Sequence, residues 1–330
     1  MSDCSSAPTR SSNDRERYRS SCLGVGMRVA GIRSLALLLG LLLLCGSSRA
    51  AVEEAAPRRI GILAAAPLNP IDSFRQRLRE LGWAEGQNVE FVHRWAEGDD
   101  TRYPALAAEL VALKVDVIFT WGSPAALAAE DATKTIPIVM GAIGTALGSA
   151  VVPSLAHPGG NITGFSSQNI EIAGKHIGLL KDLVPGIRRV AVLSNAANPT
   201  TIVGIRYAET AAKTSGLSLD NVQIRDASDL ETALPALGRT RPDAALVLAD
   251  TQLLAQRQRI VEFMTASRLP AIYAYPEFAE AGGLISYSPD FDDLFRQAAT
   301  YVDKVLRGTK PGDLPVQQAS KFKMVPRRSD

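Results

Sequence analysis

The chain has 330 residues, enough for two domains of ordinary size. Apolar residues make up 46% of it and charged residues 21%, as in a globular protein that buries a substantial core. The net charge is only +2 and aromatic residues make up only 6%, which argues against nucleic acid or an anionic membrane surface as the partner.

Residues 1–50 are predicted to be a polar leader followed by a signal peptide. Residues 1–26 are polar and basic and show no apolar periodicity, which makes Met27 the better translation start. A basic segment after Met27 leads into an apolar run at 35–44, and residues 48–50 have the small side chains of a cleavage site. This order predicts export, with a mature chain in the periplasm.

All three cysteines, Cys4, Cys22 and Cys45, precede the predicted mature start near Ala51. The mature chain would then have no disulfide and no cysteine metal site. Cys45 closes the apolar run and Gly46 follows it, so a lipoprotein anchored at Cys45 is an alternative. An uncleaved N-terminal anchor is another.

The first half alternates apolar strands with amphipathic helices. We expect strands at 59–63, 89–92, 115–122 and 136–140, and helices at 71–81, 103–114 and 123–134. Strand 115–122 is apolar on both faces, as in the middle of a parallel sheet. Ser123 suits an N-cap and Pro124 suits the first position of the helix that follows.

The second half follows the same plan. We expect helices at 174–183, 199–215, 229–237, 253–267 and 291–307, and strands at 189–193, 222–224, 244–249 and 269–273. In both halves a buried strand, a small or polar tip and a helix precede an apolar-Pro-apolar strand, at 136–139 and at 269–272. Two lobes of one design explain this match, and chance recurrence of a common βαβ unit is the alternative.

Three extended segments are predicted to join the lobes. The Gly-rich stretch 157–166 is the expected first crossing and part of a hinge, 282–289 is the return crossing, and 314–320 is the third. The predicted fold is therefore α/β, with two Rossmann-like lobes and a central ligand cleft. The predicted lobes comprise residues 58–163 plus 288–315 and residues 164–287 plus 316–325.

Sequence motifs of enzymes are largely missing. The chain has no phosphate-binding loop, no G-x-G-x-x-G and no G-x-S-x-G. Residues 320–323 match S-x-x-K, but in a strand-like context without the partner motifs. The histidines, His93, His157 and His176, do not have metal-ligand spacing. We therefore predict neither an enzyme nor a bound cofactor or metal, with catalysis by scattered carboxylates as the alternative.

Candidate ligand contacts follow the predicted strands, because parallel α/β sheets bind ligands beyond the carboxyl ends of their strands. Free N–H groups at the helix N-termini there favour an anion such as a carboxylate. In the first lobe the candidates are Pro67, Gly122, Ser123, Ala125 and Thr145. In the second lobe they are Asn195, Asn198, Asp250, Tyr275 and Glu277.

The first-lobe candidates suit a carboxylate. The Ser123 hydroxyl and the Ala125 N–H would point at one spot, and Gly122 would let a ligand approach closely. A role for Ser123 as a helix cap alone is the alternative, and the two roles are compatible.

The second-lobe candidates suit an ammonium group. Asp250 and Glu277 could pair with it, although an N-cap role for Asp250 and a solvated loop position for Glu277 are equally open. Asn195 and Asn198 can donate and accept hydrogen bonds, or else only form a turn. Tyr275 could form an apolar wall with a polar tip, or pack in the core.

Six motifs in this order resemble one family: IPIV at 136–139, PGGNITG at 158–164, LVPGI at 183–187, EAGGLISY at 280–287, LRGTKPGDLPV at 306–316 and KFKMV at 321–325. Their combination is similar to the ABC transporter substrate-binding proteins whose better-known members take up aromatic amino acids (TrpX-like). The resemblance extends over roughly residues 59–325.

This resemblance implies the type I periplasmic-binding fold, with two lobes, three crossings and a ligand cleft. It implies ligand contacts at Ser123, Asn195, Asn198, Asp250 and Glu277. It also implies an ABC permease in the inner membrane, with its cytoplasmic ATPase, as the partner of a monomeric receptor.

The sequence departs from the family at two places. Thr145-Ala146-Leu147 stands where members often have Asp-Pro-Val, and the chain ends soon after 321–325, where members continue into a helix. A changed ligand specificity and a truncated end are the corresponding expectations.

The favoured hypothesis is an exported receptor that closes on a small polar or amino-acid-like ligand and hands it to the permease. A sensor of the same fold that serves a membrane signalling partner is the alternative. A transcriptional regulator would need a helix-turn-helix before the first lobe, where residues 1–57 instead resemble an export signal.

Overall fold

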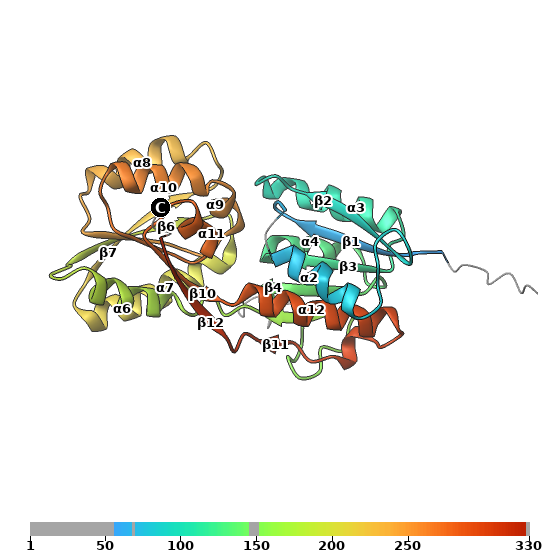
Figure 1. Cartoon of the computed structure of the whole chain (residues 1–330). Helices are drawn as coiled ribbons and strands as arrows, with labels where there is room; N and C mark the ends of the chain where they lie inside the picture. Colours follow the sequence, from blue (N-terminus) through green and yellow to red (C-terminus); the bar gives the residue numbers. More distant parts are fainter. Residues whose placement is uncertain (1–55, 68–69, 145–151, 328–330) are drawn as a thin grey trace, which may run out of the picture. The chain divides into compact units, whose positions relative to one another are not determined.

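The computed structural model describes residues 56–67, 70–144 and 152–327, which belong to one compact unit that begins at Ala55. The predicted leader and Thr145 lie outside the described residues. Two six-stranded sheets organise the described part of the chain, each at the centre of one lobe (Figure 1).

The first lobe consists of β1 (Arg58–Ala64), α2 (Pro70–Glu80), β2 (Val89–Trp95), the short η1 (Asp100–Arg102), α3 (Tyr103–Ala112), β3 (Val117–Trp121), α4 (Ser123–Ala132), β4 (Ile138–Ile143), β5 (Ile162–Ser166), α12 (Phe291–Leu306), η2 (Pro311–Asp313) and β11 (Gln317–Gln318). Its strands lie in the order β11-β5-β4-β3-β1-β2.

The second lobe consists of α6 (Ala173–Leu183), β6 (Arg189–Asn195), α7 (Pro199–Ser215), β7 (Ser218–Ile224), α8 (Leu230–Arg239), β8 (Ala244–Val247), α9 (Thr251–Ala255), α10 (Arg257–Ala266), β9 (Ala271–Tyr273), α11 (Pro276–Glu280), β10 (Ile285–Pro289) and β12 (Phe322–Pro326). Its strands lie in the order β12-β10-β9-β8-β6-β7.

The two sheets have the same strand order and differ only in the direction of one edge strand, which confirms the predicted two-lobe α/β fold. Each starts with a strand that pairs in parallel with the next two strands of its lobe, β1 with β2 and β3, and β6 with β7 and β8. The strand order reverses at these starting strands, and ligands of such sheets bind at this reversal. β12 alone is antiparallel to its neighbour, β10, among the described pairings.

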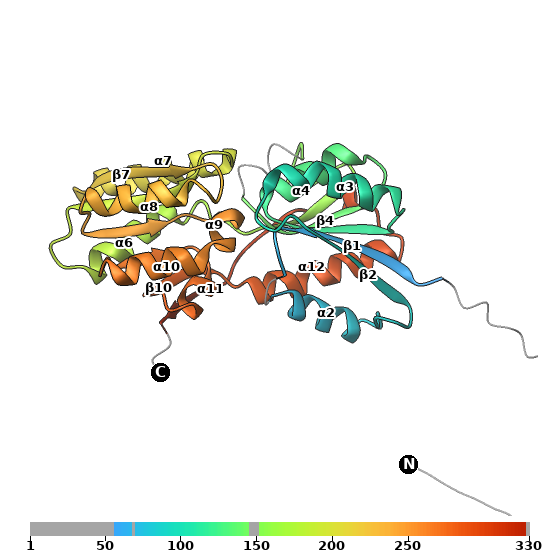
Figure 2. The same ribbon diagram turned by 90° about the horizontal axis from the view of Figure 1, so that it is seen from above.

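The polypeptide passes from one lobe to the other three times, and each crossing lies a few residues later than predicted. β5 and β11 belong to the first sheet and β10 to the second. The crossings are therefore the segments that follow Ser166, Pro289 and Gln318 (Figures 1 and 2). The stretch 157–166 was predicted as hinge because it is rich in glycine, but its second half is a fully buried strand.

Gly164 explains how a glycine can belong to that strand. Its φ is +137°, and a Cβ on it would lie 2.2 Å from the Met140 carbonyl oxygen of β4. Glycine is therefore required for the two strands to pair at this point rather than to make the segment flexible.

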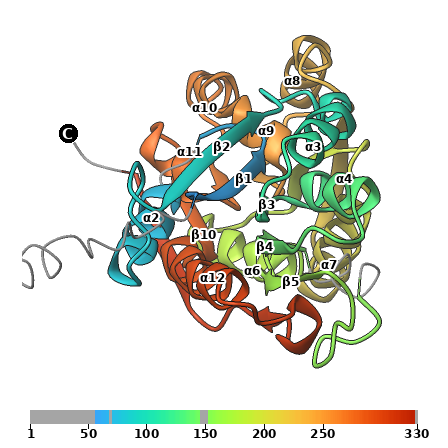
Figure 3. The ribbon, with the colours of Figure 1, turned by 90° about the vertical axis from the view of Figure 1, so that its right-hand side faces the viewer.

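Helix α12 returns to the first lobe and packs beside α2 (Figure 3). Its buried face includes the predicted Leu294, Ala298, Tyr301, Val302 and Val305. The predicted long helix at 253–267 is instead two helices, α9 and α10, which meet at Gln256. Within the described ranges, no helix combines the length and the apolar character needed to cross a bilayer.

Candidate functional site

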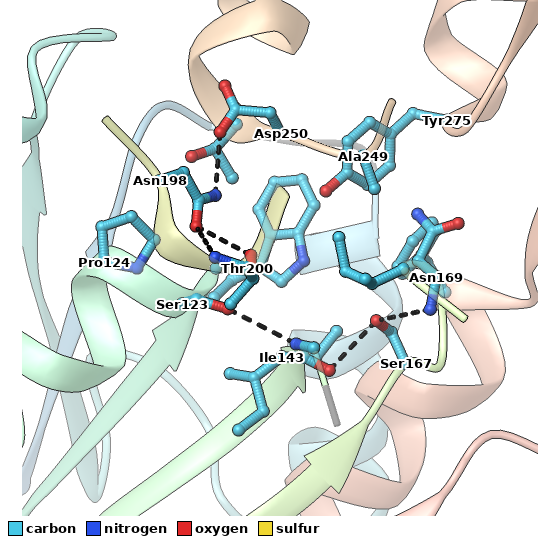
Figure 4. Close-up of a pocket in the computed structure, with 17 residues that line it drawn as sticks. Ser123, Pro124, Ile143, Ser167, Asn169, Asn198, Thr200, Ala249, Asp250 and Tyr275 are labelled. Carbon is cyan, nitrogen blue, oxygen red and sulfur yellow. Dashed lines mark hydrogen bonds between the residues drawn. The ribbon is translucent and has the colours of Figure 1, made fainter. Parts of the chain in front are cut away.

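A cavity lies beyond the ends of β3, β4 and β8 and is lined by residues of both lobes and of the first crossing (Figure 4). Its internal volume is only about 20 Å³, and the adjoining space that is open to solvent brings the total empty volume to about 360 Å³. This position agrees with the general rule for ligand sites in parallel α/β sheets.

The first lobe contributes the start of helix α4. The N-cap of α4 is Gly122, with φ +86°, and not Ser123 as predicted. Ser123 is the first helical residue, and it lies with Gly122 and Pro124 on the cavity wall. The Gly144 N–H donates to Ser123 Oγ over 3.4 Å. The N-terminus of α4 therefore presents N–H groups and a partial positive charge to this side of the cavity, as a carboxylate requires.

The second lobe contributes a buried carboxylate, Asp250, which is 1% exposed. It accepts hydrogen bonds from Asn198 Nδ2 (2.9 Å), from Asn195 Nδ2 (3.2 Å) and from the first backbone N–H groups of α9. Burial raises the pKa of Asp250, and these hydrogen bonds oppose that rise. The helix-cap role and the binding role that the sequence left open are both compatible with this geometry.

Asn198 is held in turn by helix α7. Its Oδ1 accepts from Thr200 N (3.1 Å) and Thr200 Oγ1 (2.7 Å), so its Nδ2 is directed at Asp250. Asp250 is the one acidic residue on the cavity wall, and no Arg, Lys or His of the described residues lines it. The cavity therefore has a negative group without a cation to neutralise it, which favours a cationic group on the ligand.

Three aromatic side chains form an apolar part of the wall: Trp121, Tyr275 and Phe291. Trp121 packs edge-to-face on Tyr275, with ring centroids 5.9 Å apart, and on Phe291, at 6.1 Å. Burial and the charge of Asp250 raise the pKa of Tyr275, so its hydroxyl stays protonated. This wall suits a flat or apolar ligand group.

Of the predicted contacts, Gly122, Ser123, Asn198, Asp250 and Tyr275 line the cavity. Asn195 lies behind Asp250 and binds it. Asn195 does not line the cavity, and neither do three further candidates: Ala125 is buried inside α4, Pro67 is exposed, and Glu277 faces a separate cavity near Asp290 and Lys323.

Glu277 is nevertheless not a solvated charge. It is 6% exposed and its Oε2 has no hydrogen-bond partner within the described residues. Burial raises the pKa of Glu277 to about 7.

Sequence reasoning missed the residues of the first crossing that line the cavity, Ser167 and Asn169, and also Thr200. The crossing was assigned too early in the chain, so these side chains were not considered. One pattern in the sequence could have indicated them. Residues 167–169 are polar and directly follow an apolar segment, as the other candidate residues do.

The lobes also touch at the edge of the cavity. A Cβ on Gly122 would lie 2.9 Å from Thr251 Cγ2, and Gln252 Nε2 of the second lobe donates to the Gly98 carbonyl oxygen over 3.3 Å. Near this contact, burial raises the pKa of Asp100 to about 7, and the negative charges of Asp250 and Asp99 add to the rise.

Asp100→Asn is therefore expected to stabilise the protein at neutral and alkaline pH. The wild-type carboxyl must ionise in an environment that opposes its charge, whereas in the unfolded chain it ionises freely near its ordinary pKa of 3.8. The gain in melting temperature should be absent below about pH 4, grow up to about pH 7 and then stay constant.

Thermal melts between pH 4 and 9 measure this difference. Asp182→Asn, which neutralises an exposed carboxylate on α6, is the control and should show no such dependence on pH. A difference for Asp100→Asn that is the same at pH 4 and pH 8 would contradict the assignment.

No group of three or more His, Cys, Asp or Glu side chains is placed to bind a metal ion within the described ranges. His176, the most buried of the histidines, instead hydrogen-bonds the Tyr287 carbonyl oxygen through Nε2 at 2.6 Å.

Comparison with known proteins identifies relatives over most of the described chain. The family described as ABC transporter substrate binding protein matches residues 66–328. A tyrosine-binding protein of Clostridioides difficile strain R20291 is 27% identical over 244 residues, which cover 74% of this chain and 70% of that protein.

Solved structures of similar fold support the same family assignment. The ABC domain from Streptococcus pneumoniae in complex with L-Trp is similar with a TM-score of 0.75 and 26% identity, over 82% of this chain and 92% of that one. A conserved domain protein from Vibrio cholerae O1 biovar El Tor strain N16961 gives the same TM-score and identity, over 82% and 91%. With the two-lobe fold and the cavity between strand ends, these matches place the chain in the family of ABC transporter substrate-binding proteins.

Proposed function

We propose that the protein is the extracytoplasmic receptor of an ABC importer and that its ligand is a free amino acid with an aromatic or other large apolar side chain. One observation carries this proposal. A buried carboxylate and a helix N-terminus face the same cavity, together with an aromatic wall. A zwitterion with an apolar side chain complements all three features.

In this arrangement Asp250 pairs with the ligand ammonium, and the N-terminus of α4 with Ser123 binds its carboxylate. Trp121, Tyr275 and Phe291 contact the side chain. A basic or acidic ligand side chain would be buried against this wall without a partner, which is costly. The tyrosine-binding relative and the similar structure with bound L-Trp support the same ligand class.

The wider setting follows from the family. Closure of the lobes around the ligand would present a compact receptor to an inner-membrane permease with its cytoplasmic ATPase. The sequence features of residues 1–50 support export to the periplasm. A monomer without enzymatic activity is sufficient for this role.

Binding of L-Trp, L-Tyr or L-Phe is therefore expected to raise the melting temperature, because the ligand binds only the folded state. At a ligand concentration 100 times the Kd the stabilisation is about 2.7 kcal/mol. Isothermal titration calorimetry then measures the affinity.

L-Lys, L-Glu and neutral sugars are the matched negative set in that screen. If a sugar or a charged amino acid stabilises the protein and no aromatic amino acid does, the proposed ligand class is wrong.

A further inference from the structure

We propose that a second cavity, separate from the one beside Asp250, binds an organic cation with a primary ammonium or guanidinium group, and that Glu277 is the carboxylate that receives it. This cavity is formed by helix α11, strand β12 and the second crossing, which follows Pro289. It is called the Glu277 cavity below. The ligand of the first cavity has no part in this site.

The Glu277 cavity has room for a small organic molecule. Its internal volume is about 220 Å³, whereas by the same measure about 10–15 Å³ is enough for one water molecule. Adjoining space that is open to solvent brings the total empty volume to about 610 Å³, so a ligand can enter. Both lobes line it, since Pro70 begins α2 of the first lobe and Glu277 belongs to α11 of the second.

Glu277 is buried because of the way its short helix packs. Pro276 is the first residue of α11, and the helix packs against β10 and β12, which leaves Glu277 6% exposed. The carboxyl group has a hydrogen bond with its own backbone N–H, but its Oε2 is buried without a partner among the described residues. A buried carboxylate oxygen without a partner is costly. A cationic donor would remove this cost.

The charges that act on Glu277 place its carboxyl group at the cavity wall. Burial, and then the negative charges of Glu280 and Asp292, raise the pKa of Glu277 to about 7. Glu280 and Asp292 both line the same cavity, and Asp292 belongs to α12 rather than to α11. Carboxyl groups of two different helices therefore lie near each other here. Arg257 of α10 acts in the opposite direction, but it makes no ion pair with Glu277 among the described residues.

The wall of the Glu277 cavity has an excess of negative charge. Its described residues include four acidic ones, Glu277, Glu280, Asp290 and Asp292, and one basic one, Lys323. The Lys323 ammonium lies 2.8 Å from Asp290 Oδ1 and 3.6 Å from Asp292 Oδ2, so these two carboxylates share it. Glu277 is thus a buried carboxylate that no basic side chain of the described residues pairs with, and it can receive a cation from outside.

An organic cation fits this wall better than a metal ion. Within the described ranges, no three His, Cys, Asp or Glu side chains are placed to surround one metal ion. An ammonium or guanidinium group needs a charge partner and an apolar surface for its stem. Pro289, Phe291 and Val325 provide that surface on the same wall.

The test uses n-butylammonium and n-butylguanidinium as probes, with n-butylurea as a neutral probe of similar shape. Isothermal titration calorimetry at pH 8 measures all three with the full chain and with Glu277→Gln. We expect the wild type to bind at least one of the cations at millimolar concentration, and n-butylurea not at all. Glu277→Gln should weaken binding of the cation by at least about 10-fold, because it removes the charge partner.

Proton release is a second measurement, and it needs no variant. The cation favours the ionised carboxylate, so binding at pH 7 should release about half a proton, which titrations in buffers of different ionisation enthalpy detect. Only about a tenth of the carboxyl groups are ionised at pH 6, so the affinity should be about 10-fold lower there than at pH 8. Both probes keep their charge over this range.

Two control variants separate the Glu277 cavity from other carboxylates. Asp250→Asn should bind the cation as tightly as the wild type, because Asp250 lies in the first cavity. Glu231→Gln, which neutralises an exposed carboxylate on α8, should do the same. At pH 8 Glu277→Gln should melt no lower than the wild type, because it removes a buried charge that burial disfavours, so unfolding would not explain a loss of binding.

Four results would overturn the inference. They are no binding of either cation by the wild type, equal binding of n-butylurea, an unchanged affinity in Glu277→Gln, and an affinity that is the same at pH 6 and pH 8. Loss of binding in Asp250→Asn would assign the cation to the first cavity and would overturn it as well.

Discussion

Asp250→Asn is expected to weaken binding of an amino-acid ligand by at least about 30-fold. Asparagine can still accept from the N–H groups of Gln252 and Leu253, so helix α9 keeps its cap. It cannot carry the negative charge that pairs with the ammonium. Removing one partner of a buried, hydrogen-bonded charge pair costs about 2 kcal/mol or more, which corresponds to this factor. Titration calorimetry with L-Trp, L-Tyr or L-Phe provides the measurement.

The control for Asp250→Asn is Asp290→Asn. Asp290 caps α12 by accepting from Asp293 N at 3.2 Å, but it lies outside the ligand cavity. Its replacement should leave the affinity unchanged. If Asp250→Asn binds as tightly as the wild type, Asp250 does not contact the ligand.

Asp250→Ala is a less informative variant. Alanine would remove a helix cap that also accepts hydrogen bonds from Asn195 and Asn198. Loss of such a cap costs about 1 kcal/mol by itself.

Gly164→Ala is expected to destabilise the protein by at least about 3 kcal/mol, among the largest effects of a single methyl group. The new Cβ would lie 2.2 Å from the Met140 carbonyl oxygen and 2.5 Å from the Met140 nitrogen. Both are backbone atoms of a paired strand and cannot move aside like a flexible side chain. The φ of +137° adds strain for any residue with a Cβ. Chemical denaturation with urea measures the loss.

Gly178→Ala should change the free energy of unfolding in the opposite direction. Gly178 lies inside helix α6, and a Cβ there would meet nothing within 4 Å. Alanine is about 0.5–1 kcal/mol more favourable than glycine in a helix interior, so this variant should be slightly more stable than the wild type. If Gly164→Ala is as stable as the wild type, β4 and β5 do not pair as described.

The fold was largely predictable because its signals are local. Apolar strands such as 244–247, and helices with one apolar face such as α12, follow from the periodicity of the sequence. The equivalence of the two lobes followed from a repeated order of elements, which both sheets confirm.

The crossings were harder because composition does not reveal what a glycine contacts. Gly164 was interpreted as flexible, although it is tightly packed against Met140. The hinge was consequently placed too early, and Asn169 was missed.

The candidate site shows the same limit. The sequence indicates that Ser123, Asn198 and Asp250 follow strands, so all three were predicted, and they do line one cavity. It did not show that Glu277, also just beyond a strand, faces another cavity, because this depends on how α11 packs against β10 and β12. Asn195, also predicted as a contact, does not line the cavity and donates a hydrogen bond to Asp250.

The position of β11 has a consequence for synthesis. Its residues 317–318 pair with β5 and complete the first sheet, although they follow the whole second lobe in the chain. A nascent polypeptide that leaves the ribosome cannot finish the sheet of its first lobe until residues 317–318 have been added, after nearly all of the second lobe. Folding from the N-terminus, lobe after lobe, is therefore not available to this protein. The edge of the first sheet therefore stays unpaired at β5 while the second lobe is being synthesised.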